Sequence, residues 1–274
     1  YVSKVFRDLG PLRRKLVRNG NSVLATVINN TYPQTHNSKT YLLKYLNESP
    51  TSVGNDAMDV DNTTLIPEIE LYIHLLVQVY LLDTGKLEEL NSLGEHVVQL
   101  MKSFNRRSLD FIQAKVWFYV CRAKELIGDL YSIRPELLYS LRTATLRHDI
   151  ETTASVITLL LRNYLLTHDI SQASDLVEKV EFPENAGNAL VARYYYYLAR
   201  INAIQLDYST ANECVITAIR KAPQTSLANG FVQAATKLSI VIELLMGDIP
   251  ELKVFKNKSG NLEPYFNVTK AVRL

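Results

Sequence analysis

Residues 192–223 read ARYYYYLARINAIQLDYSTANECVITAIRKAP, and this stretch decides the fold. Its large and small residues follow the spacing of a tetratricopeptide (TPR) helical hairpin. The positions that carry this spacing are Tyr195, Leu198, Ala199, Ala211, Val215, Ala218 and Pro223. On a period of 3.6 residues, the first half presents one stripe of small and apolar residues and the second half presents another. We therefore expect two helices that pack closely through their alanines.

Local sequence marks both ends of the second helix of this hairpin. We expect the stripe of the first helix to run from Ala192 to Leu206. Asp207 follows at once, and its carboxylate can accept hydrogen bonds from the free amides at the start of the second helix. Pro223 has no amide donor and suits the chain just after that helix ends. Two unrelated core helices would explain one such stretch equally well, so the hypothesis depends on whether the unit recurs.

The unit does recur along the chain. Four turns, GDLYS at 128, HDISQA at 168, LDYSTA at 206 and GDIPEL at 247, each place an aspartate before an apolar residue. The aspartates are Asp129, Asp169, Asp207 and Asp248, which are 40, 38 and 41 residues apart. This period is longer than that of a standard TPR unit, so we expect lengthened or degenerate hairpins. We predict an all-α fold, a right-handed α-solenoid of TPR-like helical hairpins.

The composition agrees with long helices. The 274 residues include 10 glycines and 9 prolines, and 47% are hydrophobic. Few helix breakers and many apolar residues favour helices over β-sandwiches and barrels. From residue 67 onward we expect helices at 67–83, 86–104, 108–128, 130–147, 151–167, 170–180, 188–206, 208–222 and 227–246, the last followed by a shorter arm.

The first 47 residues form a separate helical segment in this interpretation. Apolar patterns at 2–18, 21–30 and 39–47 are divided by Asn19-Gly20-Asn21 and by Pro33–Ser38, both of which we expect to stop helices. The basic side chains of the first pattern could bind phosphate, but a solvated helix face explains them better. They are Arg13, Arg14, Lys15 and Arg18.

Polarity and charge divide the rest of the chain. Residues 48–66 are largely polar and acidic, so they cannot bury enough surface to offset their ordering entropy, and we predict a flexible linker or insertion. We assign residues 67–255 to the repeats and residues 256–274 to a further helical segment. The formal net charge is only +2. Because basic and acidic segments alternate along the chain, the charge does not indicate a nucleic-acid-binding module.

Residues that could carry out chemistry are not grouped by any recognisable spacing. The histidines are His36, His74, His96, His148 and His168, and none has the spacing of a metal ligand set or a catalytic triad. Cys121 and Cys214 lie far apart and outside any CxxC pair, so we expect packing residues rather than a disulfide or zinc site. We therefore predict no catalytic residue, no cofactor and no metal, and a protein that is not an enzyme.

The apolar runs are far shorter than the ~20 residues of a membrane span, so we predict no membrane partner.

Two features of the hairpin at residues 192–223 allow a ligand-binding interpretation. Tyr194–Tyr197 could stack nucleic-acid bases, but at most two of four consecutive residues share a helix face, so core packing is favoured. Arg193, Arg200 and Asn202 lie where the inner helices of a repeat groove could hold a peptide carboxylate. Both stand as alternatives to a purely structural role.

Several stretches, in the right order, resemble a known family. They are LRTATLRHD (141–149), LLLRNYL (159–165), YYLARINAIQLDYSTA (196–211), AIRKAPQ (218–224) and GFVQAATKLSIVIELLMGDIPEL (230–252). Together they resemble the family of third non-ATPase subunits of the proteasome regulatory particle, which are lid components of PCI type. The resemblance covers most of residues 67–274, whereas residues 1–64 match only loosely.

The resemblance implies a non-catalytic scaffold of the proteasome lid, in the cytoplasm and nucleus, that supports ubiquitin-dependent degradation through protein contacts. It implies repeats that lead into a PCI winged-helix module, here truncated, because GNLEPYFNVTKAVRL (260–274) looks like the helix that feeds into it. Partners would be other lid subunits, including neighbouring PCI subunits. Since the chain starts at Tyr1 without methionine and ends inside a helical pattern, we expect it to be part of a longer protein.

The resemblance also implies a small, acidic, largely disordered lid subunit as a partner. From charge alone, our candidate for its contact is a basic surface at Lys253, Lys256, Lys258 and Arg273. The alternative hypothesis is a PCI or TPR-like scaffold of another assembly, in mRNA export or translation initiation, with some RNA contact. Binding to RNA phosphates weakens steeply with salt, whereas docking through apolar helix faces weakens less, so salt dependence separates the two.

Overall fold

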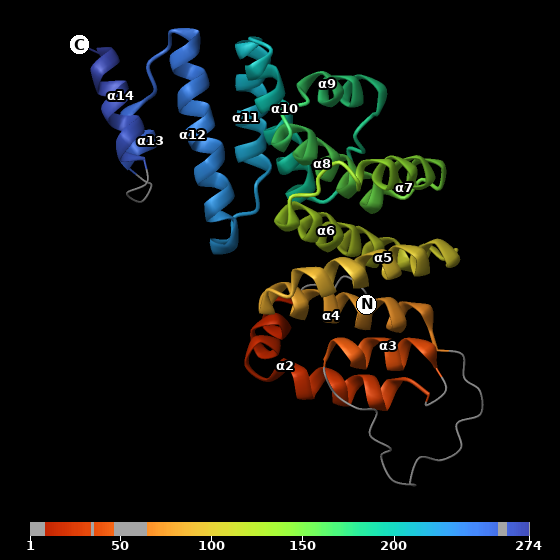
Figure 1. The fold of residues 1–274 in the computed structure, drawn as a ribbon. Coiled ribbons are helices and arrows are strands. Elements are labelled where there is room, and N and C mark those ends of the chain that lie inside the picture. Colours follow the sequence, from red (N-terminus) through yellow and green to blue (C-terminus); the bar gives the residue numbers. More distant parts are fainter. Residues whose placement is uncertain (1–8, 34–35, 47–64, 257–261, 274) are drawn as a thin grey trace. The chain divides into compact units, whose positions relative to one another are not determined.

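The computed structural model describes four parts of the chain: residues 9–33, 36–46, 65–256 and 262–273. Lys258 and nearly all of the linker predicted at 48–66 lie outside these parts. Throughout the described residues the regular elements are helices, and none is a strand (Figure 1). The prediction of an all-α fold is confirmed.

The helices of the repeats lie close to the predicted ranges. The bounds up to residue 135 are α2 (Leu9–Thr31), α3 (Asn37–Tyr45), α4 (Pro67–Thr84), α5 (Leu87–Ser103), the 3-10 helix η1 (Arg107–Leu109) and α6 (Asp110–Ile127). The later ones are α7 (Arg134–Leu146), α8 (Ile150–Leu166), α9 (Ile170–Lys179), α10 (Asn188–Ile204), α11 (Tyr208–Lys221), η2 (Ser226–Ala228), α12 (Asn229–Met246), α13 (Leu252–Lys256) and α14 (Glu263–Arg273). The shorter arm expected after 246 is α13.

The chain divides into two compact units, Tyr1–Pro135 and Glu136–Leu274. In the first unit, α4 is the central helix and contacts α2, α5 and α6. Its core includes Leu24 of α2 and Leu75 of α4, which are almost completely buried. Burying a leucine of this kind contributes about 1.5–3 kcal/mol, so the first unit has an apolar core of its own. The domain boundaries predicted at 47, 66 and 255 stay predictions.

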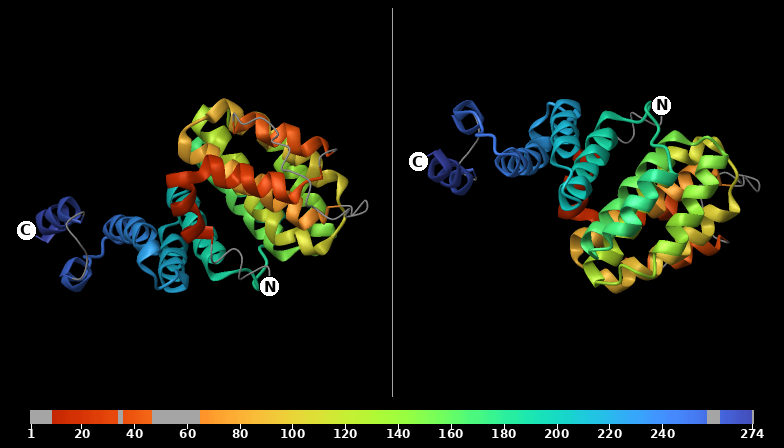
Figure 2. Two further views of the ribbon diagram at one scale, coloured as in Figure 1. Left: turned by 90° about the horizontal axis from the view of Figure 1, so that it is seen from below. Right: turned by 90° about the horizontal axis from the view of Figure 1, so that it is seen from above.

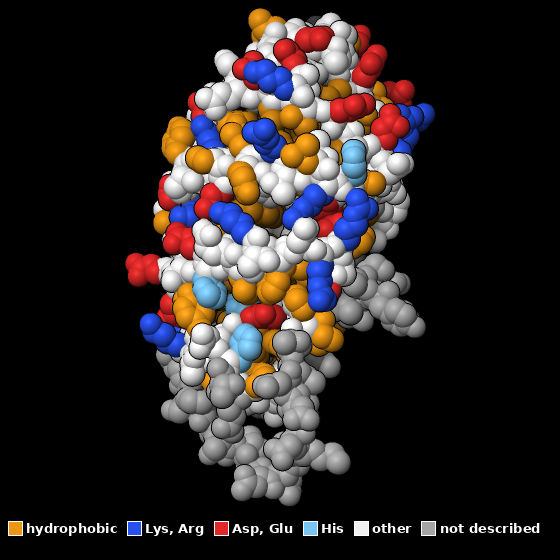
Figure 3. Space-filling model, turned by 90° about the vertical axis from the view of Figure 1, so that its right-hand side faces the viewer, with side chains coloured by type: hydrophobic (Ala, Val, Ile, Leu, Met, Phe, Trp, Pro, Cys, Tyr) orange, Lys and Arg blue, Asp and Glu red, His pale blue; other side chains and the backbone are white. Residues whose placement is uncertain are grey.

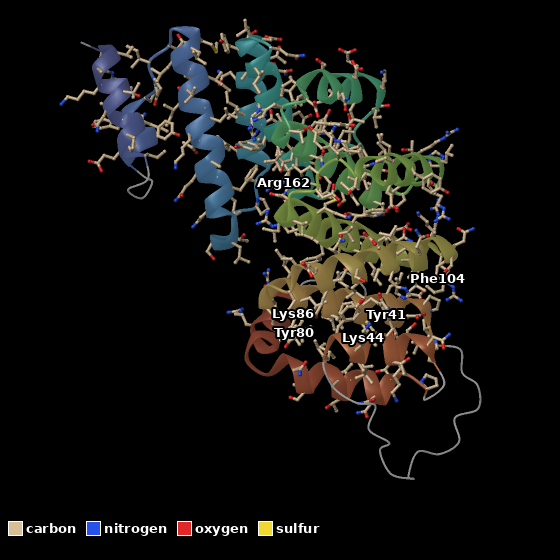
Figure 4. The ribbon with its side chains drawn as sticks, in the orientation of Figure 1. Tyr41, Lys44, Tyr80, Lys86, Phe104 and Arg162 are labelled. Carbon is tan, nitrogen blue, oxygen red and sulfur yellow. The ribbon has the colours of Figure 1, made fainter. Side chains whose placement is uncertain are left out.

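The expected helix stop at Asn19-Gly20-Asn21 is wrong, because α2 runs without interruption from Leu9 to Thr31. Gly20 is buried, and a Cβ added to it would lie 2.8 Å from two ring carbons of Tyr80 on α4. Figure 4 shows Tyr80 where α4 faces α2. The glycine therefore allows two helices to approach closely instead of ending one of them. Nearby, Arg13 of α2 forms an ion pair with Asp83 of α4.

The second unit contains the hairpin that the sequence predicted most clearly. Helices α10, α11 and α12 lie side by side (Figures 1 and 2), and α10 also contacts α8. Ala199 of α10, Ala211 and Val215 of α11 and Ile242 of α12 are fully buried in one cluster, against which Tyr195 packs. Close packing through alanines is confirmed, because small side chains let the helix axes approach.

One turn geometry recurs between consecutive helices. A residue with positive φ ends the first helix, and the amide of the next residue donates to the carbonyl oxygen five positions back. The positive-φ residues are Gly85, Gly128, His148, His168, Leu206 and Gly247. This is the Schellman arrangement, in which a left-handed residue satisfies carbonyl groups that the helix end leaves free. In five of the six turns the residue after the left-handed one is an aspartate.

Three of the four predicted turn aspartates accept hydrogen bonds close to the next helix. Asp207 is the N-cap of α11 and accepts from the Thr210 amide and the Ser209 hydroxyl. Asp169 is the N-cap of α9 and accepts from the Thr167 hydroxyl. Asp129 accepts from the backbone amide and the hydroxyl of Ser132, just before α7. The hydrogen bond from Thr210 holds the pKa of the Asp207 carboxyl below its usual range.

The remaining turn residues show where the sequence interpretation was incomplete. Asp248 has the same backbone hydrogen bond but is separated from α13 by Ile249–Glu251. Asp149, which was not predicted, is the buried N-cap of α8 and accepts from the Thr152 amide. Leu206 was expected on the buried stripe of α10, and this is wrong: it has φ 69° and is 70% exposed. The turn requires a left-handed residue at this position, and this takes precedence over the apolar period.

Candidate protein-interaction surfaces

The basic residues proposed as a partner contact belong to two neighbouring helices of the second unit. Lys253 is near the start of α13, is 88% exposed and lies 3.9 Å from the Glu251 carboxylate. Arg273 ends α14 and is exposed. The side chain of Lys256 and all of Lys258 lie outside the described residues. Helices α13 and α14 contact each other through the rings of Phe255 and Phe266, 5.3 Å apart.

Three histidines, His36, His74 and His96, lie near one another in the first unit. The His74 ring of α4 stacks on His96 of α5, with ring centroids 5.9 Å apart. Histidine side chains are visible among apolar ones on the lower part of the face in Figure 3. His74 is fully buried, and its Nδ1 donates to the Glu70 carbonyl oxygen at 2.8 Å. Its Nε2 has no partner among the described residues. Burial, and then the nearby His96 and His36, lower the pKa of His74 to about 4.

Metal binding and thiol chemistry have no support in the described parts of the chain. They contain no group of three or more His, Cys, Asp or Glu side chains that could hold a metal ion. Both cysteines are free, and burial raises the pKa of Cys121 to about 12 and that of Cys214 to about 11. A thiol with a raised pKa is a poor nucleophile. Among the same residues, no helix is both long enough and apolar enough to cross a membrane.

The four consecutive tyrosines pack against their own unit. The Tyr194 ring stacks on Phe182 with centroids 4.1 Å apart and planes 13° from parallel. The Tyr196 ring meets Phe231 edge-on at 5.5 Å, and Tyr197 is buried. Rings that are already covered by other side chains are not a platform for bases, so the packing interpretation is the one that the geometry supports.

A groove in the second unit was not foreseen from the sequence. It has a volume of about 690 Å³ and lies between α7, the start of α8 and the segment 179–184 that follows α9. Its apolar lining includes Leu138 and Leu146 of α7, Ile150 of α8 and Phe182 of the segment. We call it the Phe182 groove. None of Arg193, Arg200 and Asn202, the sequence candidates for peptide binding, lines it.

The walls of the Phe182 groove are firmly held. Phe182 is fixed by its stack on Tyr194, and Pro183 accepts a hydrogen bond from the Ala186 amide. The opposite wall is the helix α7, whose backbone groups are bonded within the helix. A preformed apolar hollow with charged residues at its rim is typical of a binding site. The sequence gives no signal for this groove, because the helical period does not distinguish the exposed Leu146 from a core leucine.

Comparison with known proteins shows the family of the chain. A family model described as PSMD3-like, N-terminal TPR repeats, matches residues 1–269. The chain belongs to the PSMD3-like family. This confirms the resemblance drawn from the five sequence stretches, and it extends the resemblance to the first 64 residues, which had matched only loosely.

Relatives of this PSMD3-like chain include regulatory subunits of the 26S proteasome. The Saccharomyces cerevisiae 26S proteasome regulatory subunit RPN3 is 39% identical, covering 100% of this chain and 58% of the relative. A probable 26S proteasome non-ATPase regulatory subunit 3 of Anopheles gambiae is 41% identical, covering 100% and 55%. A probable 26S proteasome regulatory subunit of Schizosaccharomyces pombe is 41% identical, covering 98% and 55%. The chain thus spans little more than half the length of these relatives.

Proposed function

We propose that this chain is the helical-repeat part of a non-catalytic scaffold subunit of the proteasome regulatory-particle lid. The observation that carries the proposal is the PSMD3-like family match over residues 1–269. The names of the relatives, including "non-ATPase regulatory subunit", support a regulatory rather than catalytic role. The subunit would serve ubiquitin-dependent degradation by holding other proteins in place, in the cytoplasm and nucleus where the complex works.

The proposed partners are other lid subunits, including neighbouring PCI subunits and a small acidic subunit. Stacked hairpins suit this role because they provide long surfaces whose shape does not depend on a ligand. The contact proposed for the acidic subunit is the basic surface that includes Lys253 and Arg273, both of which are exposed. Long-range attraction to an acidic chain would favour its association and would be screened by salt.

Purification of the assembly tests the proposal. The full-length protein, tagged and isolated from cells at moderate salt, should bring other regulatory-particle subunits with it, identified by mass spectrometry. The same tag on an unrelated helical-repeat protein is the control. Enrichment of an RNA-bound assembly that is lost steeply as salt rises, without proteasome subunits, would overturn the proposal.

A charge-reversal variant tests the basic surface separately. Lys253→Glu combined with Arg273→Glu should reduce recovery of the acidic subunit while leaving the other subunits in place. Lys221→Glu, a reversal of an exposed lysine at the end of α11, is the matched control. Equal recovery of the acidic subunit with both variants would remove these two residues from the proposed contact. Fluorescence microscopy of the tagged protein checks the proposed location.

A further inference from the structure

The Phe182 groove leaves several large aliphatic side chains in water. Leu146 is 73% exposed, Leu138 is 43% exposed and Ile150 is 42% exposed. The upper part of the face in Figure 3 shows apolar side chains among charged ones. Single exposed leucines are common, but a hollow lined by several of them is typical of a surface that another molecule covers. Its volume of about 690 Å³ lies within the roughly 300–1,000 Å³ range of specific binding sites.

The charges at the rim of the groove differ from one wall to the other. Arg142 projects from α7, whereas Glu181 and Glu184 belong to the segment opposite. Among the described residues, none of these three side chains has an ion-pair partner. Lys179, at the same rim, is already paired with Asp175 at 3.4 Å. The apolar floor is therefore flanked by one free positive charge on the α7 wall and two free negative charges on the opposite segment, while the Asp149 carboxylate, also in the lining, is held by the Thr152 amide.

We propose that the Phe182 groove binds an amphipathic helix from a neighbouring subunit. The helix would place a stripe of Leu, Ile or Phe side chains, spaced three and four residues apart, on the apolar floor. Lys or Arg residues on one side of that stripe would face Glu181 and Glu184, and an Asp or Glu on the other side would face Arg142. This arrangement satisfies all three free charges and fixes the direction of the helix, because the reversed helix would bring like charges together.

Side chains rather than backbone groups would make this contact. Leu138 and Arg142 lie in the middle turns of α7, where backbone groups are bonded within the helix, so these residues offer only their side chains. The firm hold on Phe182 means that the site needs little rearrangement when the helix binds. The proposal rests on the proposed function, since the bound helix belongs to a subunit of the same assembly.

Photo-cross-linking in the intact assembly tests the proposal. The full-length protein carries p-benzoylphenylalanine in place of Leu146, and the assembly is purified through a tag on this protein before irradiation. We expect a cross-link to a segment of another subunit that has an apolar helical stripe with basic residues on one side and an acidic residue on the other. The same probe in place of Leu227, which is 97% exposed and outside the groove, should not cross-link to that segment.

Charge reversal makes the test specific. Glu181→Lys with Glu184→Lys should reduce the cross-linked fraction about tenfold, because two attractive contacts become repulsive. Reversal of the facing Lys or Arg in the mapped helix should restore it. Glu213→Lys, an exposed glutamate of α11, is the control and should leave the fraction unchanged. Restoration by the second reversal excludes a simple loss of folding.

The remaining outcomes overturn the proposal. They are a cross-link to the protein's own chain or to a second copy of it, a cross-linked segment without the expected charges, a yield insensitive to the reversals, or no cross-link. Subunits that co-purify are identified in the same samples. If regulatory-particle subunits co-purify while the groove gives no cross-link, only the groove proposal fails. If no such subunit co-purifies, the proposed function is wrong, and the groove proposal, which rests on it, is wrong as well.

Discussion

The backbone of Gly20 lies directly against the ring of Tyr80, so that a Cβ at position 20 would come within 2.8 Å of two ring carbons. Gly20→Ala should therefore destabilise the first unit by about 1–3 kcal/mol, because the ring or the helix must move. Urea unfolding and amide hydrogen exchange of α2 and α4 measure this. Gly10→Ala, also in α2 but with no neighbour within 4 Å, is the control and should be neutral or slightly stabilising. Equal effects of the two changes would contradict the close contact.

The recurrent left-handed residue predicts two opposite effects of substitution. Gly128 has φ 89° and open space around it, so Gly128→Ala should cost about 1 kcal/mol through backbone strain alone. Leu206 holds the same conformation with φ 69° and a largely exposed side chain, so Leu206→Gly should stabilise by about 1 kcal/mol. Denaturation midpoints test both. A loss of stability in Leu206→Gly would show that its side chain matters more than its backbone.

The buried cap of α8 predicts a further effect on stability. Asp149 accepts a hydrogen bond from the Thr152 amide at 3.1 Å, so Asp149→Ala leaves that amide without its partner and should cost about 1 kcal/mol. Asp149→Asn keeps an acceptor oxygen and should lose much less. Thermal unfolding of the two variants compares them directly. Similar losses would mean that the negative charge, rather than the cap, stabilises the turn.

Stability should fall in mild acid because His74 is buried in its neutral form. Its pKa is about 4 in the folded protein, compared with about 6.5 when exposed, so the unfolded state takes up the proton first. The stabilisation is complete above pH 6.5 and is lost between about 6.5 and about 4, by about 3 kcal/mol in total. The groups that face this ring are His96 from α5 and His36 before α3, and both oppose a second positive charge. His74→Gln should flatten the pH dependence of urea unfolding over this range. Parallel curves for the two proteins would contradict the assignment.

Much of the fold was predictable because its signals are local. The 3.6-residue period and the turn aspartates lie within a few residues of the structure that they determine. Asp207, for example, caps the helix that begins at the next residue. Gly20 was misjudged because its partner, Tyr80, is distant in sequence, and the local pattern of an Asn-Gly-Asn turn is the same whether or not a ring lies against it. At Leu206 two local requirements compete, and the turn geometry prevails over the apolar stripe.

The surfaces were harder to predict than the helices. The Phe182 groove combines α7 with a segment after α9, and neither part suggests a binding site alone. Its exposed Leu146 follows the same helical period as a core leucine, so only packing distinguishes them. The charges of Lys253 and Arg273 locate a basic region but do not identify a partner. The family resemblance lies in five stretches of sequence rather than in any site.

The Schellman turn also determines where the chain can change length. The amide of Asp207 bonds the end of α10, and its carboxylate caps the start of α11. The number of residues between these two helices is therefore fixed. One inserted residue would rotate the following helix by about 100° and turn its alanine face away from its neighbour. The links 180–187 and 222–228 are longer and contain no left-handed residue of this kind. Differences in length among members of the family should therefore accumulate at these links rather than at the Schellman turns.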